Sequence, residues 1–286
     1  MENFLYAAKI KFGVIYHNKK AFFGFNVLIF FILMATIGPF IIKLDMSTDY
    51  LNRFQTPSIS HIFGTDYAGR DTFAQIVHGS TDVMLIAFSA AVLGTFLAIL
   101  FGFLSGLVGG RTDRIIMQVT DVFLTLPRFP IMAIFAGLFS IKDPISFGFL
   151  LGIFEWASLA RALRNQIMTL KNKEFIEVNF IMNMPMKHIM FNELFPNMFP
   201  FIGVNFINIA KGAITASVGI MLLGIVPLSS TNWGMMLNLA TTQTGAIYIP
   251  NAYPYLLAPI FFIVLFQFSL ICFASGVEEL FDPRLR

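Results

Sequence analysis

The sequence predicts an all-α membrane protein with six transmembrane helices. Of its 286 residues, 57% are apolar and only 12% are charged, whereas roughly a quarter of an ordinary soluble domain is charged. Too few polar side chains remain to cover a surface that faces water, which argues against a cytosolic enzyme. The apolar runs are continuous rather than alternating, so helices are expected and a membrane β-barrel is not.

Six segments are long and apolar enough to cross the hydrocarbon core, which takes about 20 residues. They are 21–42, 83–110, 115–139, 144–163, 199–226 and 253–277. Pro127 and Pro130 can bend the third span, and the polar residues from Pro227 to Asn251 predict a loop between the fifth and sixth spans. The first run is longer than the core of a cleavable signal peptide, so a retained helix is expected.

The distribution of Lys and Arg predicts that both termini are cytoplasmic, because these residues concentrate in cytoplasmic loops. With the N-terminus inside, 13 of the 19 Lys and Arg residues lie in cytoplasmic segments and four lie outside. We therefore expect residues 1–82 to comprise an N-terminal cytoplasmic segment, the first transmembrane helix and the extracytoplasmic loop 43–82. A core transmembrane domain 83–277 with the cytoplasmic loop 164–198 follows, and then a cytoplasmic tail 278–286.

The cytoplasmic loop 164–198 contains a short helix that is unusually apolar. We expect this helix to begin near Glu174 and to end at Asn183, which tolerates the left-handed conformation of a C-cap. Pro185 can open a second helix, which Pro196 is expected to break. Because apolar side chains wrap much of the first helix, it requires cover on more than one side.

Two hypotheses account for that apolar helix. It is either a lid packed on the ends of its own spans or a coupling helix that inserts into a groove of a cytosolic partner. In the second case, Glu174 and Glu177 lie on one face of the helix, because they are three residues apart. The expected coupling residues are Glu174, Glu177, Val178, Phe180, Asn183, Pro185 and Lys187.

Charged side chains within the predicted spans are candidates for a translocation pathway, because ionisable groups are costly inside a bilayer. They are Arg128 in the third span, Glu155 in the fourth and Lys211 in the fifth. Glu155 and Lys211 either pair with each other or face a cavity, where one acid and two bases would suit the two termini of a peptide. Asp121 is expected near the cytoplasmic end of its span, where water is close.

The sequence contains no motif for catalysis or for a bound cofactor. It has no G-x-x-x-x-G-K-[ST] phosphate loop, no His/Cys cluster with metal-ligand spacing and no nucleophile–base pair. Its net charge of +3, without a dense basic run, does not indicate nucleic acid. We therefore expect no enzymatic activity, and Gly109-Gly110 is interpreted as a break between two spans rather than a phosphate cradle.

Several motifs nevertheless share a pattern with one transporter family. Residues 61–71 read His-x-x-Gly-Thr-Asp-x-x-Gly-Arg-Asp. The other matching residues are Gly109, Gly110, Asp113, Asp121, Trp156, Arg161, Arg164, Glu177, Trp233, Gly234, Asp282, Pro283 and Arg284. Together they resemble the second permease subunit of ATP-binding-cassette importers for oligopeptides and dipeptides. Val178, Asn179 and Asn183 stand where the family's coupling loop has two alanines and a glycine.

The resemblance implies a type I importer subunit with six helices in the plasma or inner membrane. It implies a heterodimer with a homologous permease subunit, two cytosolic ATPases that bind ATP and Mg²⁺, and an extracytoplasmic solute-binding protein. This chain itself would bind no cofactor. ATP binding would close the ATPases and pull on the coupling helices, so Glu177 and its neighbours would lie at the ATPase surface.

Other functions stay open on the sequence. Nickel, metallophore and oligosaccharide importers use similar permeases, and the binding protein does much of the selecting. A self-contained secondary transporter usually has internal repeats, and no clear repeat relates 1–143 to 144–286. A membrane scaffold without cargo is a third possibility.

Overall fold

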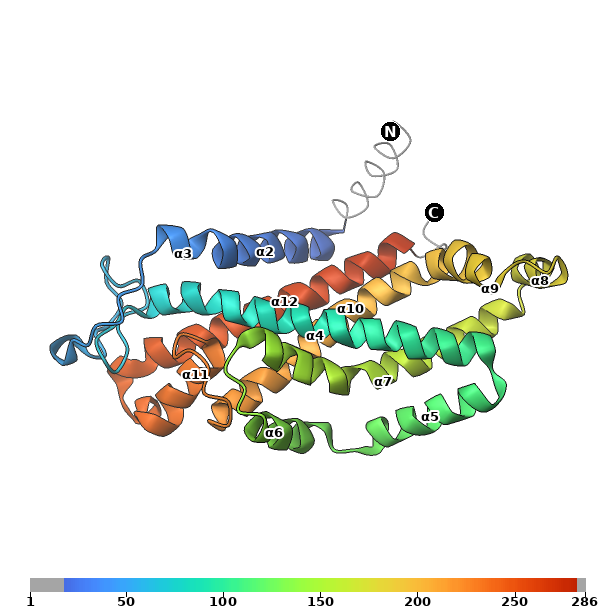
Figure 1. The fold of residues 1–286 in the computed structure, drawn as a ribbon. Helices are drawn as coiled ribbons and strands as arrows, with labels where there is room; N and C mark the ends of the chain where they lie inside the picture. Colours follow the sequence, from blue (N-terminus) through green and yellow to red (C-terminus); the bar gives the residue numbers. More distant parts are fainter. Residues whose placement is uncertain (1–17, 282–286) are drawn as a thin grey trace.

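The computed structural model describes residues 18–281, apart from the side chains of Phe175, Phe180, Leu280 and Phe281, as an elongated bundle of helices (Figure 1). The α-helices are α2 (Lys19–Thr36), α3 (Gly38–Ile41), α4 (Thr72–Val108), α5 (Gly110–Thr125), α6 (Arg128–Leu138), α7 (Pro144–Lys171), α8 (Glu174–Ile181), α9 (Met186–His188), α10 (Phe195–Leu222), α11 (Trp233–Asn238) and α12 (Tyr253–Phe281). The π-helical turns are η2 (Ile189–Leu194) and η3 (Leu239–Gln243). The 3-10 turns are η1 (Tyr50–Asn52), η4 (Ala246–Tyr248) and η5 (Pro250–Ala252). No strand occurs between residues 18 and 281, which confirms the predicted all-α class.

Five helical segments are long and apolar enough to cross a membrane, and the pair α5 and α6 makes a sixth candidate. The pair is bent by 89°, so the third predicted span, 115–139, is broken rather than continuous. The break has a local cause, because the residue before a proline is pushed out of the helical region. Leu126 is extended at φ −68° and ψ 139°, and Pro127 caps the start of α6.

Helix α4 is longer than the predicted second span, which was expected to begin at residue 83. It begins at Thr72 because the Asp71 carboxylate accepts a hydrogen bond from the Phe73 backbone N–H at 2.8 Å. The connection between α3 and α4 is therefore shorter than the polar stretch 43–82, because the last residues of that stretch form the start of α4; where α4 enters the membrane stays a prediction. At its other end α4 stops at Gly109 (φ +68°), and α5 starts with Gly110 (φ +59°), which confirms the expected break.

The bundle is built on the contact between α4 and α7, where small residues allow the two backbones to approach closely. A Cβ added at Gly102 would lie 2.9 Å from the Ala160 carbonyl oxygen, and one at Gly152 would lie 2.7 Å from the Ala90 carbonyl oxygen. Helices α2, α10 and α12 pack around this pair, and Phe31 of α2 is fully buried.

The predicted loop between the fifth and sixth spans is a folded element. It contains α11, which Asn232 caps by accepting a hydrogen bond from the Gly234 N–H at 3.0 Å. The buried Trp233 indole donates to the Ile76 carbonyl oxygen at 2.9 Å, which ties α11 to α4. The sequence predicted a loop because this segment is rich in polar residues. In the structure, those residues cap helices and form turns within a folded unit.

The start of α2, the end of α12 and helix α8 all lie toward one end of the bundle (Figure 1). The Asn18 side chain hydrogen-bonds the Glu279 carboxylate there. We name this the inner end and the opposite one the outer end, after the orientation predicted from Lys and Arg. That the inner end faces the cytoplasm stays a prediction.

The close contact between α4 and the segment before α11 predicts that adding one methyl group at Gly79 destabilises the fold. A Cβ at Gly79 would lie 2.0 Å from the Thr231 carbonyl oxygen, so Gly79→Ala should lower the free energy of unfolding by roughly 1–3 kcal/mol through overpacking. Thermal unfolding of the purified protein in detergent measures this. Gly203→Ala is the matched control, because an added Cβ there meets nothing within 4 Å, and equal melting temperatures of the two variants would contradict a tight contact at Gly79.

Candidate functional site

Helix α8 projects from the inner end of the bundle between α7 and α9 (Figure 1). It ends before Asn183, which has φ +51° and confirms the expected left-handed turn. Pro185 is extended (φ −61°, ψ 138°) and opens α9, also as predicted. The chain therefore leaves α7, forms one isolated helix and returns to the bundle within a few residues.

Among the described side chains of α8, Ile176 packs the helix onto the bundle. Ile176 is fully buried and belongs to the same apolar core as Ile167, Ile189 and Leu194. The remaining described surface of α8 is largely open, because Glu174, Glu177 and Val178 are exposed.

Most of the predicted coupling residues thus lie together on an exposed surface at the inner end. Ile181, at 74% exposure, adds an apolar side chain that the sequence prediction omitted. Asn183, Pro185 and Lys187 are exposed as well, whereas the Phe180 side chain lies outside the described residues. The lid hypothesis requires α8 to cover its apolar face with its own spans, and the described chain leaves Val178 and Ile181 uncovered.

A polar network fixes the end of α7 immediately before α8. Arg164 donates to both carboxylate oxygens of Asp113, with Nε at 3.0 Å and Nη2 at 2.5 Å, and the Ser105 hydroxyl also donates to Asp113. About two turns further along α7, Lys171 Nζ donates to the Leu107 carbonyl oxygen at 2.8 Å. These bonds hold α7 against the corner between α4 and α5, because a bidentate arginine–carboxylate pair also sets orientation.

The segment after α8 runs without interruption into α10, and the prediction that Pro196 breaks it is wrong. Pro196 lies in the first turn of α10, where a missing N–H is tolerated. The π-helical turn η2 precedes it, so Met186–Leu222 forms one helical segment that is long and apolar enough to cross a membrane.

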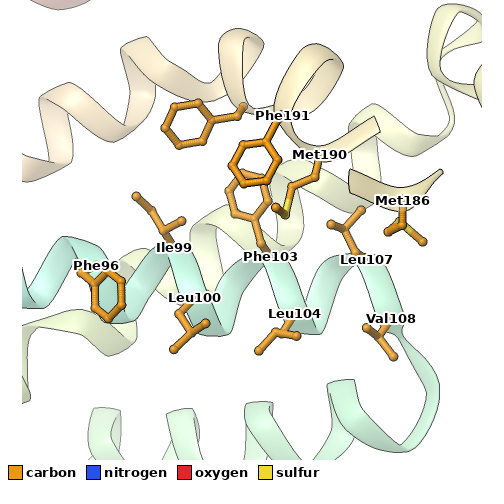
Figure 2. A pocket seen from close by; sticks show the side chains of 11 residues that line it. Phe96, Ile99, Leu100, Phe103, Leu104, Leu107, Val108, Met186, Met190 and Phe191 are labelled. Atoms are coloured by element: carbon orange, nitrogen blue, oxygen red, sulfur yellow. The ribbon is translucent and has the colours of Figure 1, made fainter. Parts of the chain in front are cut away.

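An apolar pocket separates this segment from the inner half of α4. Its volume is about 370 Å³, and Figure 2 shows side chains from α4 and from the chain after α8 converging on it. The lining residues are Phe96, Ile99, Leu100, Phe103, Leu104, Leu107, Val108, Met186, Met190, Phe191 and Phe195. Methionine side chains adapt readily to changes in packing, so this wall can repack when the segment shifts.

Of the two alternatives for Glu155 and Lys211, the pairing of one with the other is wrong. Glu155 instead accepts from Arg128, with Oε2 and Nη1 3.3 Å apart. The bend before α6 places Arg128 against α7, and on α10 it is Gly212 that faces the Glu155 carboxylate, since an added Cβ would lie 3.3 Å from Oε1. Lys211 is turned away from Glu155 and donates to the Asn208 side chain at 3.1 Å.

Lys211 is part of a polar stripe on α10 that no sequence motif indicated. Thr215 donates to the Lys211 carbonyl oxygen, and Gln267 of α12 donates to the Thr215 hydroxyl at 3.0 Å. Asn208 and Thr215 are exposed in the described chain. Polar groups facing lipid tails are costly, so this stripe requires a wet cavity or a protein neighbour.

Asp121 and Arg161 form an ion pair that joins α5 to α7. Both side chains are well exposed on the bundle, at 60% and 39%, and the position of Asp121 close to water stays a prediction. This pair reinforces the contact between α5 and α7 rather than contributing to a buried pathway.

The motif at residues 61–71 forms a tight structural element at the outer end. The buried Asp66 carboxylate accepts from the N–H groups of Ala68 (2.8 Å) and Arg70 (2.9 Å) and from the Gln75 side chain (3.0 Å). Gly64 and Gly69 adopt φ values of +68° and +79°. The motif therefore stabilises the turn into α4.

Comparisons with known proteins agree with this architecture. Residues 98–286 match the family described as the binding-protein-dependent transport system inner membrane component. The oligopeptide transport system permease protein OppC of Bacillus subtilis (strain 168) is 31% identical over 94% of this chain and 87% of its own length. OppC of Haemophilus influenzae is 28% identical over 95% of this chain and 86% of the relative. The dipeptide transport system permease protein DppC of Bacillus subtilis is 29% identical over 94% and 83%. Together with the spans of the bundle, these matches show that the chain belongs to the family of multi-pass inner membrane components of binding-protein-dependent transport systems.

Proposed function

We propose that this chain is a permease subunit of an ATP-driven peptide importer and that α8 is its coupling helix. The observation that carries the proposal is the exposed acidic and apolar surface of α8. Ile176 packs this helix onto the apolar core, and the Arg164–Asp113 pair fixes the end of α7 from which it emerges. The relatives named for oligopeptide and dipeptide transport support peptides as the cargo. Nickel, metallophore and oligosaccharide cargoes are less favoured for the same reason.

The partners follow from what this chain lacks. The sequence has no phosphate loop, so ATP and Mg²⁺ would be bound by two cytosolic ATPases that grip α8 and its counterpart on a second permease. That second permease is a homologous subunit, and the two chains enclose the pathway between them. The polar stripe around Lys211 and the Arg128–Glu155 pair would then face this shared cavity, which removes the cost of exposing them to lipid.

The geometry suggests how ATPase closure reaches the pathway. A pull on α8 acts through Ile176 on α7 and on the turn η2, which continues directly into α10. Since α10 places Gly212 against the Glu155 carboxylate and carries Lys211 beside Asn208, a shift of this helix would alter the charges that line the proposed pathway. The adaptable pocket wall at Met186 and Met190 allows the shift without opening the core.

Charge introduced on the exposed face of α8 is expected to break coupling. Val178 and Ile181 would enter an apolar groove of the ATPase, so the pair of substitutions Val178→Glu and Ile181→Glu should weaken ATPase binding by tenfold or more, or about 1.4 kcal/mol. Copurification of the ATPase and peptide uptake into proteoliposomes measure the effect. The conservative pair Val178→Ile and Ile181→Leu is the control. Normal copurification and uptake with the two glutamates would show that α8 is not the docking element.

Substitutions in the Arg128–Glu155 pair can distinguish a structural role of these residues from a role in transport. Glu155→Gln leaves Arg128 without its partner and should lower the free energy of unfolding by roughly 1–2 kcal/mol, a value discounted because Arg128 is one-third exposed. The double variant with Arg128→Gln should regain much of this stability but transport dipeptides with free termini poorly. Thermal unfolding and uptake assays measure the two effects. Uptake by the double variant at the rate of the unaltered protein would remove both residues from the pathway.

A further inference from the structure

The apolar pocket between the inner half of α4 and the chain after α8 is a long groove, which we name the inner groove. Its lining follows α4 from Phe96 to Val108 (Figure 2), which corresponds to a helical rise of about 18 Å. Phe103 and Leu107 form a buried floor, whereas Phe96 and Val108 on the rim are 61% and 60% exposed. The groove is therefore open along one side of the bundle.

The opposite wall of the inner groove includes an unusual helical turn. Met190 and Phe191 lie in the π-helical turn η2, and both line the groove. Phe191 is 59% exposed. A π-helical turn is a rare departure from the α-helix and is found frequently at functional sites. The irregular backbone thus coincides with the border of the groove.

The lining of the inner groove suits a hydrocarbon group. Every lining side chain is that of Phe, Ile, Leu, Val or Met, whereas sites for polar small molecules carry a few polar groups that orient the ligand. The volume of about 370 Å³ is too small for a helix, since a cylinder of 10 Å diameter and 18 Å length encloses roughly 1,400 Å³. The groove can accommodate one hydrocarbon chain, or one row of side chains from a helix packed over it.

The length of the inner groove matches the depth of one leaflet. The hydrocarbon core of a bilayer is about 30 Å thick, so the acyl chains of one leaflet cover about 15 Å. The groove begins where the apolar run of α4 ends, at the break formed by Gly109 and Gly110. An acyl chain that enters at this break would reach to about Phe96.

Basic side chains gather at the same end of the inner groove. Lys187 is exposed and directly follows the lining residue Met186. Lys171 Nζ donates to the carbonyl oxygen of Leu107, another lining residue, at 2.8 Å. Arg111 is exposed at the start of α5, directly after the break. An apolar groove with basic groups at one end is complementary to a molecule with a hydrocarbon chain and an anionic head.

We propose that the inner groove binds one acyl chain of an anionic phospholipid, with the phosphate of the lipid at Lys187 and Arg111. The inference goes beyond the proposed function and requires only that the bundle lie in a bilayer. A partner helix would supply side chains to the groove but no anion to its basic end, whereas a phospholipid supplies both in one molecule. Of the neighbouring acidic groups, Asp113 is paired with Arg164, and Glu193 of η2 is not among the lining residues.

Photocross-linking tests the lipid site in the full-length chain. The protein, with any subunits that copurify, is placed in phosphatidylcholine nanodiscs, and the probe is phosphatidylglycerol with a diazirine at the end of one acyl chain. Mass spectrometry should locate the cross-links at residues 96–100. Phosphatidylcholine with the same diazirine should label these residues roughly tenfold or more weakly, because each basic group near an anionic headgroup favours it about fivefold.

A substitution that fills the inner groove tests where the chain lies. Leu104→Trp should remove most of the labelling at residues 96–100, because the indole occupies the groove. Leu85→Trp is the matched control, since Leu85 is on the same helix, lies outside the lining and is 37% exposed against 41% for Leu104. Thermal unfolding of both variants shows whether the fold is kept. Undiminished labelling of a folded Leu104→Trp variant would contradict the site.

Removal of the basic groups tests the headgroup while leaving the inner groove intact. Arg111→Gln with Lys187→Gln should lower the preference for phosphatidylglycerol roughly tenfold or more. Lys43→Gln with Lys142→Gln is the matched control, because it removes the same charge from exposed positions toward the outer end. Equal labelling by the two lipids, or labelling spread evenly over residues 85–108, would overturn the inference. Labelling by neither lipid in the assembled protein would assign the groove to a neighbouring helix and overturn it as well.

Discussion

The close contact between α4 and α7 is the constraint on which the rest of the structure depends. In a bilayer, apolar side chains gain little from leaving lipid, so helices associate through backbone approach and hydrogen bonds instead. Gly102 and Gly152 permit that approach, and Arg164 and Lys171 lock the inner ends of the two helices with polar bonds. Every other span packs around this pair, and α7 leads directly into α8.

The same pair of helices connects the two ends of the molecule. The Asp66 turn caps α4 at the outer end, while α7 delivers the chain into α8 at the inner end. Between them lie the polar stripe on α10 and the Arg128–Glu155 pair. In the proposed importer, an ATPase bound at α8 would act on α7 and on the segment from η2 into α10.

Much of this organisation was predictable from the sequence because of how the bilayer acts as a solvent. Long uncharged runs predicted the spans, and Gly109 with Gly110 predicted the break after α4, since two consecutive positive φ values favour glycine. Asn183 likewise predicted the turn after α8. One boundary was wrong for a local reason, because the chain stays helical through Pro196, which follows the π-helical turn η2. Asp71 starts α4 earlier than its uncharged run begins.

What the sequence by itself determined about this protein is the number of apolar spans, the position of the short helix in the loop 164–198 and the absence of a phosphate loop. These are properties of composition and local backbone preference. Only the tertiary structure decided that Glu155 pairs with Arg128 and not with Lys211, and that Ile176 packs α8 onto the apolar core. Such outcomes depend on which faces of distant helices meet, and a rotation of α10 by one residue is enough to place Gly212 rather than Lys211 before the carboxylate.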